Sequence, residues 1–183
     1  GISVEDINFG KKMGYAIKLL AIGKNSENGV EVRVHPSFIR NSHPLASVND
    51  SYNAVYLTGD AVEDVMLYGR GAGALPTASA IVGDVIYCAT HTNYRYSTFD
   101  NTPNASPNTK FITNFESAYY IRIEATARTG VLAKLTSIFS KRGINVAQMV
   151  QEDAPENSEV VPLIFITHKT NEQSVDKAVS EIN

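Results

Sequence analysis

The C-terminal third of the chain changes repeatedly between the two-residue hydrophobic period of strands and the 3.6-residue period of helices. Strand patterns cover residues 119–126, 145–151 and 160–167, and helical patterns cover residues 131–141 and the residues from Thr170 onward. The order strand, helix, strand, strand, helix predicts an α+β unit with one shared core. A closing strand would complete a βαββαβ module, and we expect that strand to lie outside this chain.

Both predicted helices carry an apolar face and a recognisable end. Gly143 follows the first helix at the position where a left-handed residue ends a helix. Thr170 is predicted to begin the last helix, with Gln173 as its capping-box partner. The apolar faces predict a core of Val131, Leu132, Leu135, Ile138, Phe139, Val175, Ala178, Val179 and Ile182.

The first half of the chain predicts a short helix followed by antiparallel strands. Ser3 and the aspartate three residues later have the spacing of a capping box. Residues 15–22 form an apolar run, residues 30–34 alternate between valine and polar side chains, and the short connector between them predicts a hairpin. We expect residues 53–59 and 63–69 to add two strands to the same sheet.

A glycine-rich turn, residues 69–73, leads into a further helical pattern. Pro76 fits the first turn of this helix. Its apolar stripe consists of Ala78, Ile81, Val82, Val85, Ile86 and Ala89. The chain then becomes rich in Asn, Thr, Ser and Pro, so we place a linker at residues 93–116, between a first domain, 1–92, and a second domain, 117–183.

Composition excludes several classes of protein. The formal net charge of −3 provides no basic surface for nucleic acid. No apolar run reaches the roughly 18–20 residues that cross a bilayer, so we expect no membrane partner. The single cysteine, Cys88, excludes a disulfide framework and favours a reducing cytoplasm. The four histidines lack ligand spacing, so we predict no metal site.

The Gly-Arg-Gly-Ala-Gly turn at residues 69–73 has two interpretations. Glycine amides ahead of a helix N-terminus form an anion site. This turn, however, lacks the P-loop pattern and does not follow the first strand of a βαβ unit. The second interpretation is a tight strand-to-helix turn that needs glycine for backbone reasons. The residues alone leave both interpretations open.

The same turn, together with Thr-Ala-Ser-Ala at residues 77–80, resembles the closing helix of the catalytic region of homoserine dehydrogenases. Segments upstream, such as residues 14–21 and 43–48, fit the same family. The resemblance implies that the turn lies against the nicotinamide end of bound NADP or NAD, with Gly73 in contact and Gly71 and Ala72 behind it. A side chain at Gly73 would keep the backbone from approaching the ring.

The resemblance also implies that the catalytic machinery lies outside this chain. The lysine and acidic residues that bind homoserine and relay its proton are expected ahead of Gly1, and the nucleotide-binding domain further ahead. We therefore assign no catalytic residue, and we expect the chain alone to be inactive. The choice between NAD and NADP belongs to that other domain. Lys18, within a predicted strand, is expected to point to a surface or a subunit contact.

Residues 119–151 resemble an ACT domain, a ferredoxin-like module that senses amino acids. The resemblance implies that a small amino-acid effector, usually threonine, binds between paired modules at Gly130, Val131 and Asn145. Ala127 stands where the family usually has aspartate, which removes one polar contact. Asn145 keeps a second interpretation, in which its side chain satisfies the strand–helix junction.

These features predict an α+β chain in two parts, an antiparallel-rich mixed sheet with covering helices and an ACT domain. The implied reaction is the NAD(P)-dependent interconversion of L-homoserine and L-aspartate 4-semialdehyde in threonine, methionine and isoleucine biosynthesis, with amino-acid feedback. We expect at least a dimer, because the first-half sheet has no evident second cover. The alternative function is a non-catalytic amino-acid-binding regulatory protein that uses its first half for dimerisation.

Overall fold

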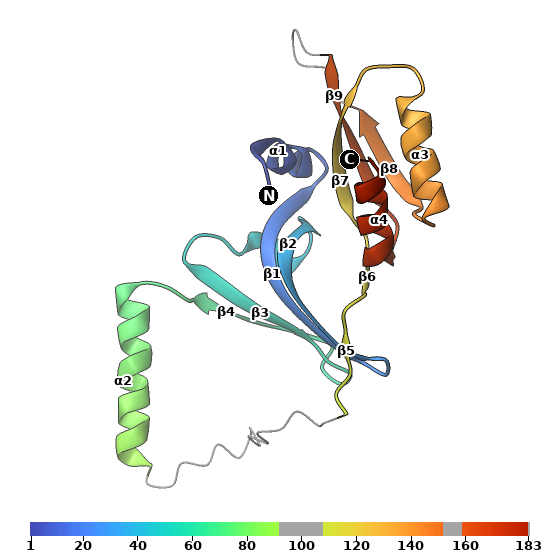
Figure 1. Cartoon of the computed structure of the whole chain (residues 1–183). Helices are drawn as coiled ribbons and strands as arrows, with labels where there is room; N and C mark the ends of the chain where they lie inside the picture. Colours follow the sequence, from blue (N-terminus) through green and yellow to red (C-terminus); the bar gives the residue numbers. More distant parts are fainter. Residues whose placement is uncertain (92–107, 152–158, 183) are drawn as a thin grey trace. The chain divides into compact units, whose positions relative to one another are not determined.

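The computed structural model describes residues 1–91, 108–151 and 159–182. The chain divides into two compact units (Figure 1). Unit 1 contains Gly1–Ala21 and Val34–Asn108, and unit 2 contains Ile22–Arg33 and Thr109–Asn183. The units therefore do not separate at a single point, because the tip of the first hairpin, Ile22–Arg33, belongs with the C-terminal residues.

Helix α1, Val4–Lys12, begins with the predicted capping box. The Ser3 hydroxyl accepts a hydrogen bond from the Asp6 amide at 3.2 Å, and the Asp6 carboxylate accepts one from the Ser3 amide at 2.8 Å. Both bonds satisfy amides that the first helical turn leaves without intrahelical partners. The helix start is therefore determined locally, as the spacing of the two residues predicts.

Strands β1, Tyr15–Ser26, and β2, Gly29–Arg40, form the predicted hairpin. Both strands are longer than their hydrophobic patterns. Pairing continues through polar residues such as Lys24 and Asn25, because main-chain hydrogen bonds do not depend on side-chain polarity. Strand β2 also pairs on its other side with β5, Phe111–Ile112, which gives a three-stranded sheet in the order β1-β2-β5.

Strands β3, Tyr52–Thr58, and β4, Asp64–Arg70, lie within two residues of their predicted positions and pair antiparallel. The expectation that they extend the β1–β2 sheet is wrong. Within the described residues they form a two-stranded sheet of their own. Strand patterns identify segments, whereas the choice of neighbour depends on contacts between distant parts of the chain.

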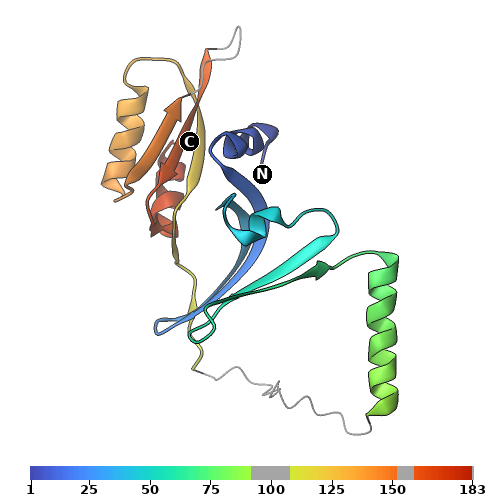
Figure 2. The same ribbon diagram turned by 180° about the vertical axis from the view of Figure 1, so that it is seen from behind.

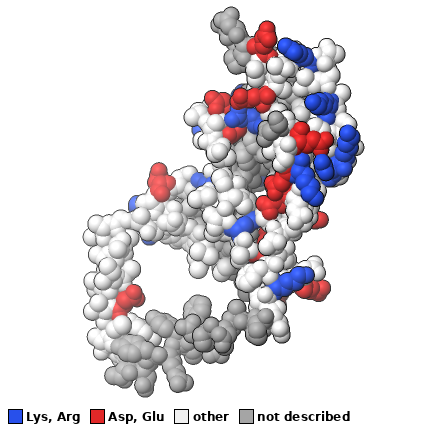
Figure 3. All heavy atoms as spheres, viewed as in Figure 1, with Lys and Arg blue, Asp and Glu red and all other residues white. Residues whose placement is uncertain are grey.

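Helix α2, Ala74–Thr90, follows β4 and carries the predicted apolar stripe. Among the described residues nothing buries this stripe: Leu75 is 84% exposed, and Ile81 and Val85 are 58% and 61% exposed. Its surface is almost entirely free of charge in Figure 3. An apolar helix face of this size marks a surface that another part of a protein covers. None of the described helices is long and apolar enough to cross a membrane.

Unit 2 contains the predicted strand–helix–strand–strand–helix order. Strand β7, Tyr120–Thr126, and strand β8, Val146–Gln151, both pair antiparallel with the central strand β9, Val160–Thr167. The sheet order is β7-β9-β8. Helix α3, Val131–Lys141, has the predicted bounds, and Gly143 after it has a positive φ of 70°, as its predicted role requires.

Helices α3 and α4, Glu172–Ile182, pack on the same face of this sheet (Figures 1 and 2). Phe165 of β9 is completely buried, and Phe139 of α3 meets it edge to face at a ring distance of 5.1 Å. The other members of the core are Ile121, Leu135, Ile138, Ile144, Leu163, Val175 and Ala178. Leu132 and Val179, expected in the core, lie at its margin with 37% and 38% exposure.

The last helix begins two residues later than predicted. Thr170 and Asn171 form a short strand, β10, which pairs with β6, Glu116–Ser117. The Asn171 side chain caps α4 instead, accepting a hydrogen bond from the Gln173 amide at 3.0 Å. Thr170 therefore pairs in a strand because a distant segment, invisible to a local capping pattern, offers it a partner. Most of the predicted linker, residues 93–107, lies outside the described residues.

Replacing Phe139 by alanine should lower the free energy of unfolding of the chain by about 3–5 kcal/mol, because it removes a buried ring and leaves a cavity beside Phe165. Urea unfolding followed by circular dichroism measures the loss. Leu132→Ala, on the same helix at the core margin, is the control and should cost about 1 kcal/mol or less. Equal losses in the two variants would contradict this account of the core.

Candidate functional site

The predicted cofactor-facing turn connects the end of β4 to the first residue of α2. Gly73, the residue before α2, has φ 124° and ψ 151°, a conformation that residues with a side chain rarely adopt. A Cβ atom there would also lie 3.3 Å from the Cδ atom of Pro76. The backbone conformation at position 73 therefore requires glycine by itself, which supports the structural interpretation of the turn. The functional interpretation stays a prediction.

Gly71 is required for a different reason, since it lies directly over Asn53 at the start of β3. A Cβ atom on Gly71 would lie 1.8 Å from the Asn53 amide nitrogen and 2.6 Å from its Cγ atom. The Gly71 amide donates to the Ser51 carbonyl at 3.0 Å. Ala72, the third predicted residue, is exposed in the same turn. The three predicted cofactor residues thus form one exposed turn, held from below by residues 51–53.

Side chains flank the turn as well. The Arg70 guanidinium donates to the Ser51 hydroxyl at 2.9 Å and lies 4.7 Å above the Tyr52 ring, which stacks in parallel on Tyr68 at 4.8 Å. Sequence reasoning did not single out Ser51, Asn53 or Arg70. The only local signal is a group of polar residues at the start of a strand, and the fold brings that group beneath the glycines.

The first turn of α2 leaves amides pointing outward. No side chain of the described residues caps this helix, and Leu75 in its first turn is 84% exposed. Helix N-terminal amides carry partial positive charge and attract anions or the negative ends of dipoles. The glycine turn and the start of α2 are therefore both exposed and carry no capping side chain among the described residues.

A polar cluster lies at the other end of the β3–β4 hairpin. The pKa of the Asp64 carboxyl is lowered by the hydrogen bond from Thr58, then by that from Tyr56, with a smaller contribution from the charge of His43. The pKa of Tyr56 is raised by its hydrogen bond to Asp64, with smaller contributions from burial and the Asp64 charge. Thr58 and Asp64 are cross-strand partners, joined at 2.7 Å between the hydroxyl and the carboxylate. The cluster ties the hairpin together at its turn.

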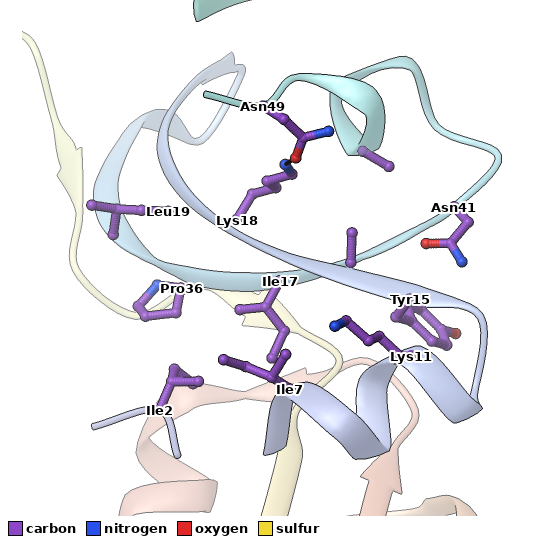
Figure 4. Close-up of a pocket in the computed structure, with 12 residues that line it drawn as sticks. Ile2, Ile7, Lys11, Tyr15, Ile17, Lys18, Leu19, Pro36, Asn41 and Asn49 are labelled. Atoms are coloured by element: carbon purple, nitrogen blue, oxygen red, sulfur yellow. Dashed lines mark hydrogen bonds between the residues drawn. The ribbon is translucent and has the colours of Figure 1, made fainter. Parts of the chain in front are cut away.

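A hollow of about 530 Å³ lies in unit 1 (Figure 4). Its lining includes Ile7 and Lys11 of α1, Ile17 and Lys18 of β1, and Asn49. The Lys18 amine donates to the Val48 carbonyl and, at 2.7 Å, to the Asn49 side chain. Lys18 therefore anchors the end of the short 3₁₀ helix at residues 44–47, a role that its position in an alternating strand did not predict.

The predicted effector residues lie at opposite ends of α3. Gly130, with a left-handed φ of 91°, precedes the helix, and Val131 is its first residue and packs at the margin of the core. Asn145 follows the other end, immediately before β8. Eleven helical residues span about 16 Å. A single small amino acid cannot reach both ends, so one module does not bring these three residues together.

The junction at Asn145 is made by its main chain. The His168 amide donates to the Asn145 carbonyl at 2.8 Å, and the residue itself is exposed. At the other end, the amide of Ala127 donates to the Glu159 carbonyl at 2.8 Å. Asn145 is accessible at this position, and its contact with a ligand stays a prediction.

Two family models match the chain. Residues 1–86 match the model described as homoserine dehydrogenase, and residues 119–183 match the ACT domain model. Curated relatives named homoserine dehydrogenase include one from Pseudomonas aeruginosa, 38% identical over 97% of this chain, and one from Bacillus subtilis, 33% identical over all of it. The chain spans 42% of the length of each.

A solved structure shows the same likeness. The crystal structure of a homoserine dehydrogenase from Thiobacillus denitrificans matches this chain with a TM-score of 0.80 and 36% sequence identity. The match covers 97% of this chain and 41% of the other chain. Both halves of the chain are thus matched in sequence and in fold. Residues 1–86 belong to the homoserine dehydrogenase family, and residues 119–183 form an ACT domain.

Proposed function

We propose that this chain works as the ACT-bearing part of an NAD(P)-dependent homoserine dehydrogenase. The observation that carries the proposal is that relatives of this name align with 97–100% of the chain, across both the family region and the ACT domain. The reaction moves a hydride between the nicotinamide ring and the C4 carbon of the substrate. A proton is exchanged at the aldehyde or alcohol oxygen, which interconverts L-aspartate 4-semialdehyde and L-homoserine.

The described residues supply part of this chemistry. The chain spans 42% of the length of these two relatives. We propose that the remainder of such an enzyme holds the dinucleotide and the lysine and acidic groups of the proton relay. The glycine turn would then meet NADP or NAD at its nicotinamide end, with Gly73 closest and Gly71 and Ala72 behind it. Its exposed position, uncapped helix start and absence of side chains at residues 71 and 73 support this assignment.

A chimera tests the function directly. This chain replaces the matched segment of the Pseudomonas aeruginosa relative, and homoserine-dependent reduction of NAD and of NADP is measured by absorbance. We expect activity in the chimera and none in the 183-residue chain alone, because hydride transfer requires a held cofactor and a positioned proton relay. Activity of the chain alone, or a folded chimera without activity, would contradict the proposal.

Replacing Gly73 by valine in the chimera should raise the KM for the nicotinamide cofactor about tenfold or more. A side chain shifts the turn out of its φ of 124° and adds bulk where the ring approaches. Gly69→Ala is the matched control, because a Cβ atom there meets open space. Thermal unfolding is measured in parallel. If Gly73→Val lowers only the melting temperature and leaves KM unchanged, the turn has a structural role alone.

We further propose that the ACT domain binds a small amino acid between two copies of the chain. The separation of Gly130 and Asn145 along α3 supports this, since a ligand small enough to be an amino acid can contact both only if they come from different modules. Threonine is the first candidate, with isoleucine and methionine as competitors. Ala127 in place of aspartate lowers the expected affinity, because one polar contact to the ligand is missing.

Mixing two variants tests this shared site. Gly130→Asn fills the ligand approach while keeping a residue that tolerates left-handed backbone, and Asn145→Ala removes the opposing side chain. Each variant alone should lose threonine binding by calorimetry. Unfolded together and refolded at equal amounts, they should regain about a quarter of wild-type sites, since half the dimers are mixed and each holds one intact site. No recovery after both single variants have lost binding would contradict the shared site, and binding retained by a single variant would show that its residue does not contact the ligand.

The alternative, a regulatory protein without catalysis, rests on one observation. The apolar faces of α2 and of β3–β4 are exposed, with Leu57 at 53% and Leu67 at 60% exposure, which suits a dimerisation platform. The chimera distinguishes the two functions. Threonine binding and dimerisation by the 183-residue chain, combined with an inactive chimera that is folded, would favour the regulatory protein.

A further inference from the structure

The ACT unit includes a piece of the family region. Residues Ile22–Arg33, the tip of the β1–β2 hairpin, group with Thr109–Asn183 rather than with the segments before and after them. They nevertheless lie within residues 1–86, which match the homoserine dehydrogenase model. Strands β1 and β2 thus run without interruption from the family region into the ACT unit.

The hairpin tip is attached to the ACT unit through main-chain contacts. Strand β2 pairs in parallel with β5, and the Val30 amide donates to the Lys110 carbonyl at 2.9 Å. Gly29 has a φ of 132°, and a Cβ atom on it would lie 2.3 Å from the Lys110 carbonyl oxygen. Only glycine allows so close an approach. We call this contact, Gly29–Arg33 against residues 110–115, the hairpin joint.

Buried charges complete the hairpin joint. The Arg33 side chain is only 10% exposed, contacts the Glu31 carboxylate through its Nη1 atom, and places its guanidinium 4.1 Å from the Phe115 ring. The Glu31 side chain is 11% exposed, and Lys24 adds a second cation at 3.6 Å. A buried ion pair adds little net stability because desolvation offsets attraction. The ion pair lies within β2, where it holds the Arg33 guanidinium in place, and the contact that crosses to the other segment is that guanidinium on the Phe115 ring.

The same segment holds the start of α4. The Phe115 carbonyl accepts a hydrogen bond from the Glu172 amide at 3.1 Å, and the Asn114 side chain accepts one from the Gln173 amide at 3.3 Å. Residues 116–117 then pair with 170–171. Residues 110–117 therefore contact the hairpin tip at one end and the first turn of α4 at the other.

The Tyr119 side chain is influenced by charges at both ends of the segment formed by residues 110–117. Its pKa is raised to about 12, first by burial and then by the negative charge of Glu172, while the positive charge of Arg33 opposes the rise. Its hydroxyl is buried. A charged group of the hairpin joint and one of the first turn of α4 thus act on the same phenol.

We propose that the hairpin joint couples the ligand state of the ACT domain to the β1–β2 hairpin of the family region. A ligand at Gly130 or Asn145 acts on α3, which shares its core with α4, and α4 begins on the segment that holds the hairpin. The chain has two states, one with the hairpin joint formed and one with it released. A ligand that binds one state more tightly shifts the population toward that state, and the change reaches the family region through β1 and β2. The regulatory use rests on the effector binding proposed above, whereas the mechanical coupling does not.

Hydrogen exchange on the 183-residue chain tests the coupling without any ligand. Arg33→Gln should accelerate exchange of the Val30, Glu172 and Gln173 amides by about tenfold or more, because releasing the hairpin frees residues 114–117. Arg142→Gln is the matched control: Arg142 pairs with Glu181 at 2.7 Å in the same unit, away from the hairpin joint. Acceleration confined to Val30, or equal in both variants, would overturn the coupling.

A second variant separates release from unfolding. Glu31→Gln combined with Arg33→Met removes both charges and leaves no buried charge without a partner, so the chain should keep its melting temperature. The loss of the guanidinium contact with Phe115 should still accelerate exchange at Glu172 and Gln173. A double variant with wild-type melting temperature and wild-type exchange at these amides would also overturn the coupling.

Inhibition of the chimera by threonine tests the regulatory use. In the double variant we expect the activity measured without threonine to lie within about twofold of wild type. The affinity for threonine should also lie within about twofold, but saturating threonine should no longer inhibit the enzyme. Arg142→Gln should be inhibited like wild type. Inhibition retained in the double variant would overturn the regulatory role. If wild-type chimera binds no amino acid, the effector proposal fails together with this role, and the exchange experiment alone decides the coupling.

Discussion

The packing of α3 and α4 on the β7-β9-β8 sheet, centred on Phe165, is the interaction on which the rest of unit 2 depends. Phe165 is fully buried and Phe139 meets its ring edge to face. This core holds α3 against the sheet, and so positions Gly130 and Asn145 at the two ends of that helix. It also places the start of α4, whose first amides bind residues 114 and 115. The proposed effector residues and the start of α4, which contacts the segment of the hairpin joint, are therefore both positioned by one apolar core.

Unit 1 is organised on a different physical basis. Local pairing, capping and tight turns define its elements, while the stripe of α2 and one face of β3–β4 remain exposed among the described residues. Such surfaces gain stability only when another surface removes them from water. The glycine turn at the start of α2 is defined locally, through the φ of Gly73 and the close approach of Gly71 to Asn53, so its shape does not depend on that cover.

The two kinds of glycine in the chain show how structure and function overlap. Gly71 and Gly29 are required because neighbouring atoms leave no space for a Cβ atom, and Gly73 because its backbone is left-handed. Each has a sufficient structural reason. A role for the turn in cofactor binding is therefore an addition to a structural requirement, and only a measurement that separates binding from stability distinguishes the two.

The sequence by itself determined the helices, the longer strands and much of the unit 2 core, but not the short strands β5, β6 and β10. The bounds of α3 and β9, the capping box of α1 and the left-handed Gly143 agree with local patterns, because they depend on side-chain period and on residues a few positions apart. The predicted cofactor and effector residues also came from local motifs. Tertiary structure alone decided that β3 and β4 form a separate sheet, that Asn171 rather than Thr170 caps α4, that Lys18 anchors a loop, and that Arg33 stacks on Phe115. Each of these contacts depends on the position of a main-chain or side-chain group supplied by a different segment, and no pattern within a single segment encodes that position.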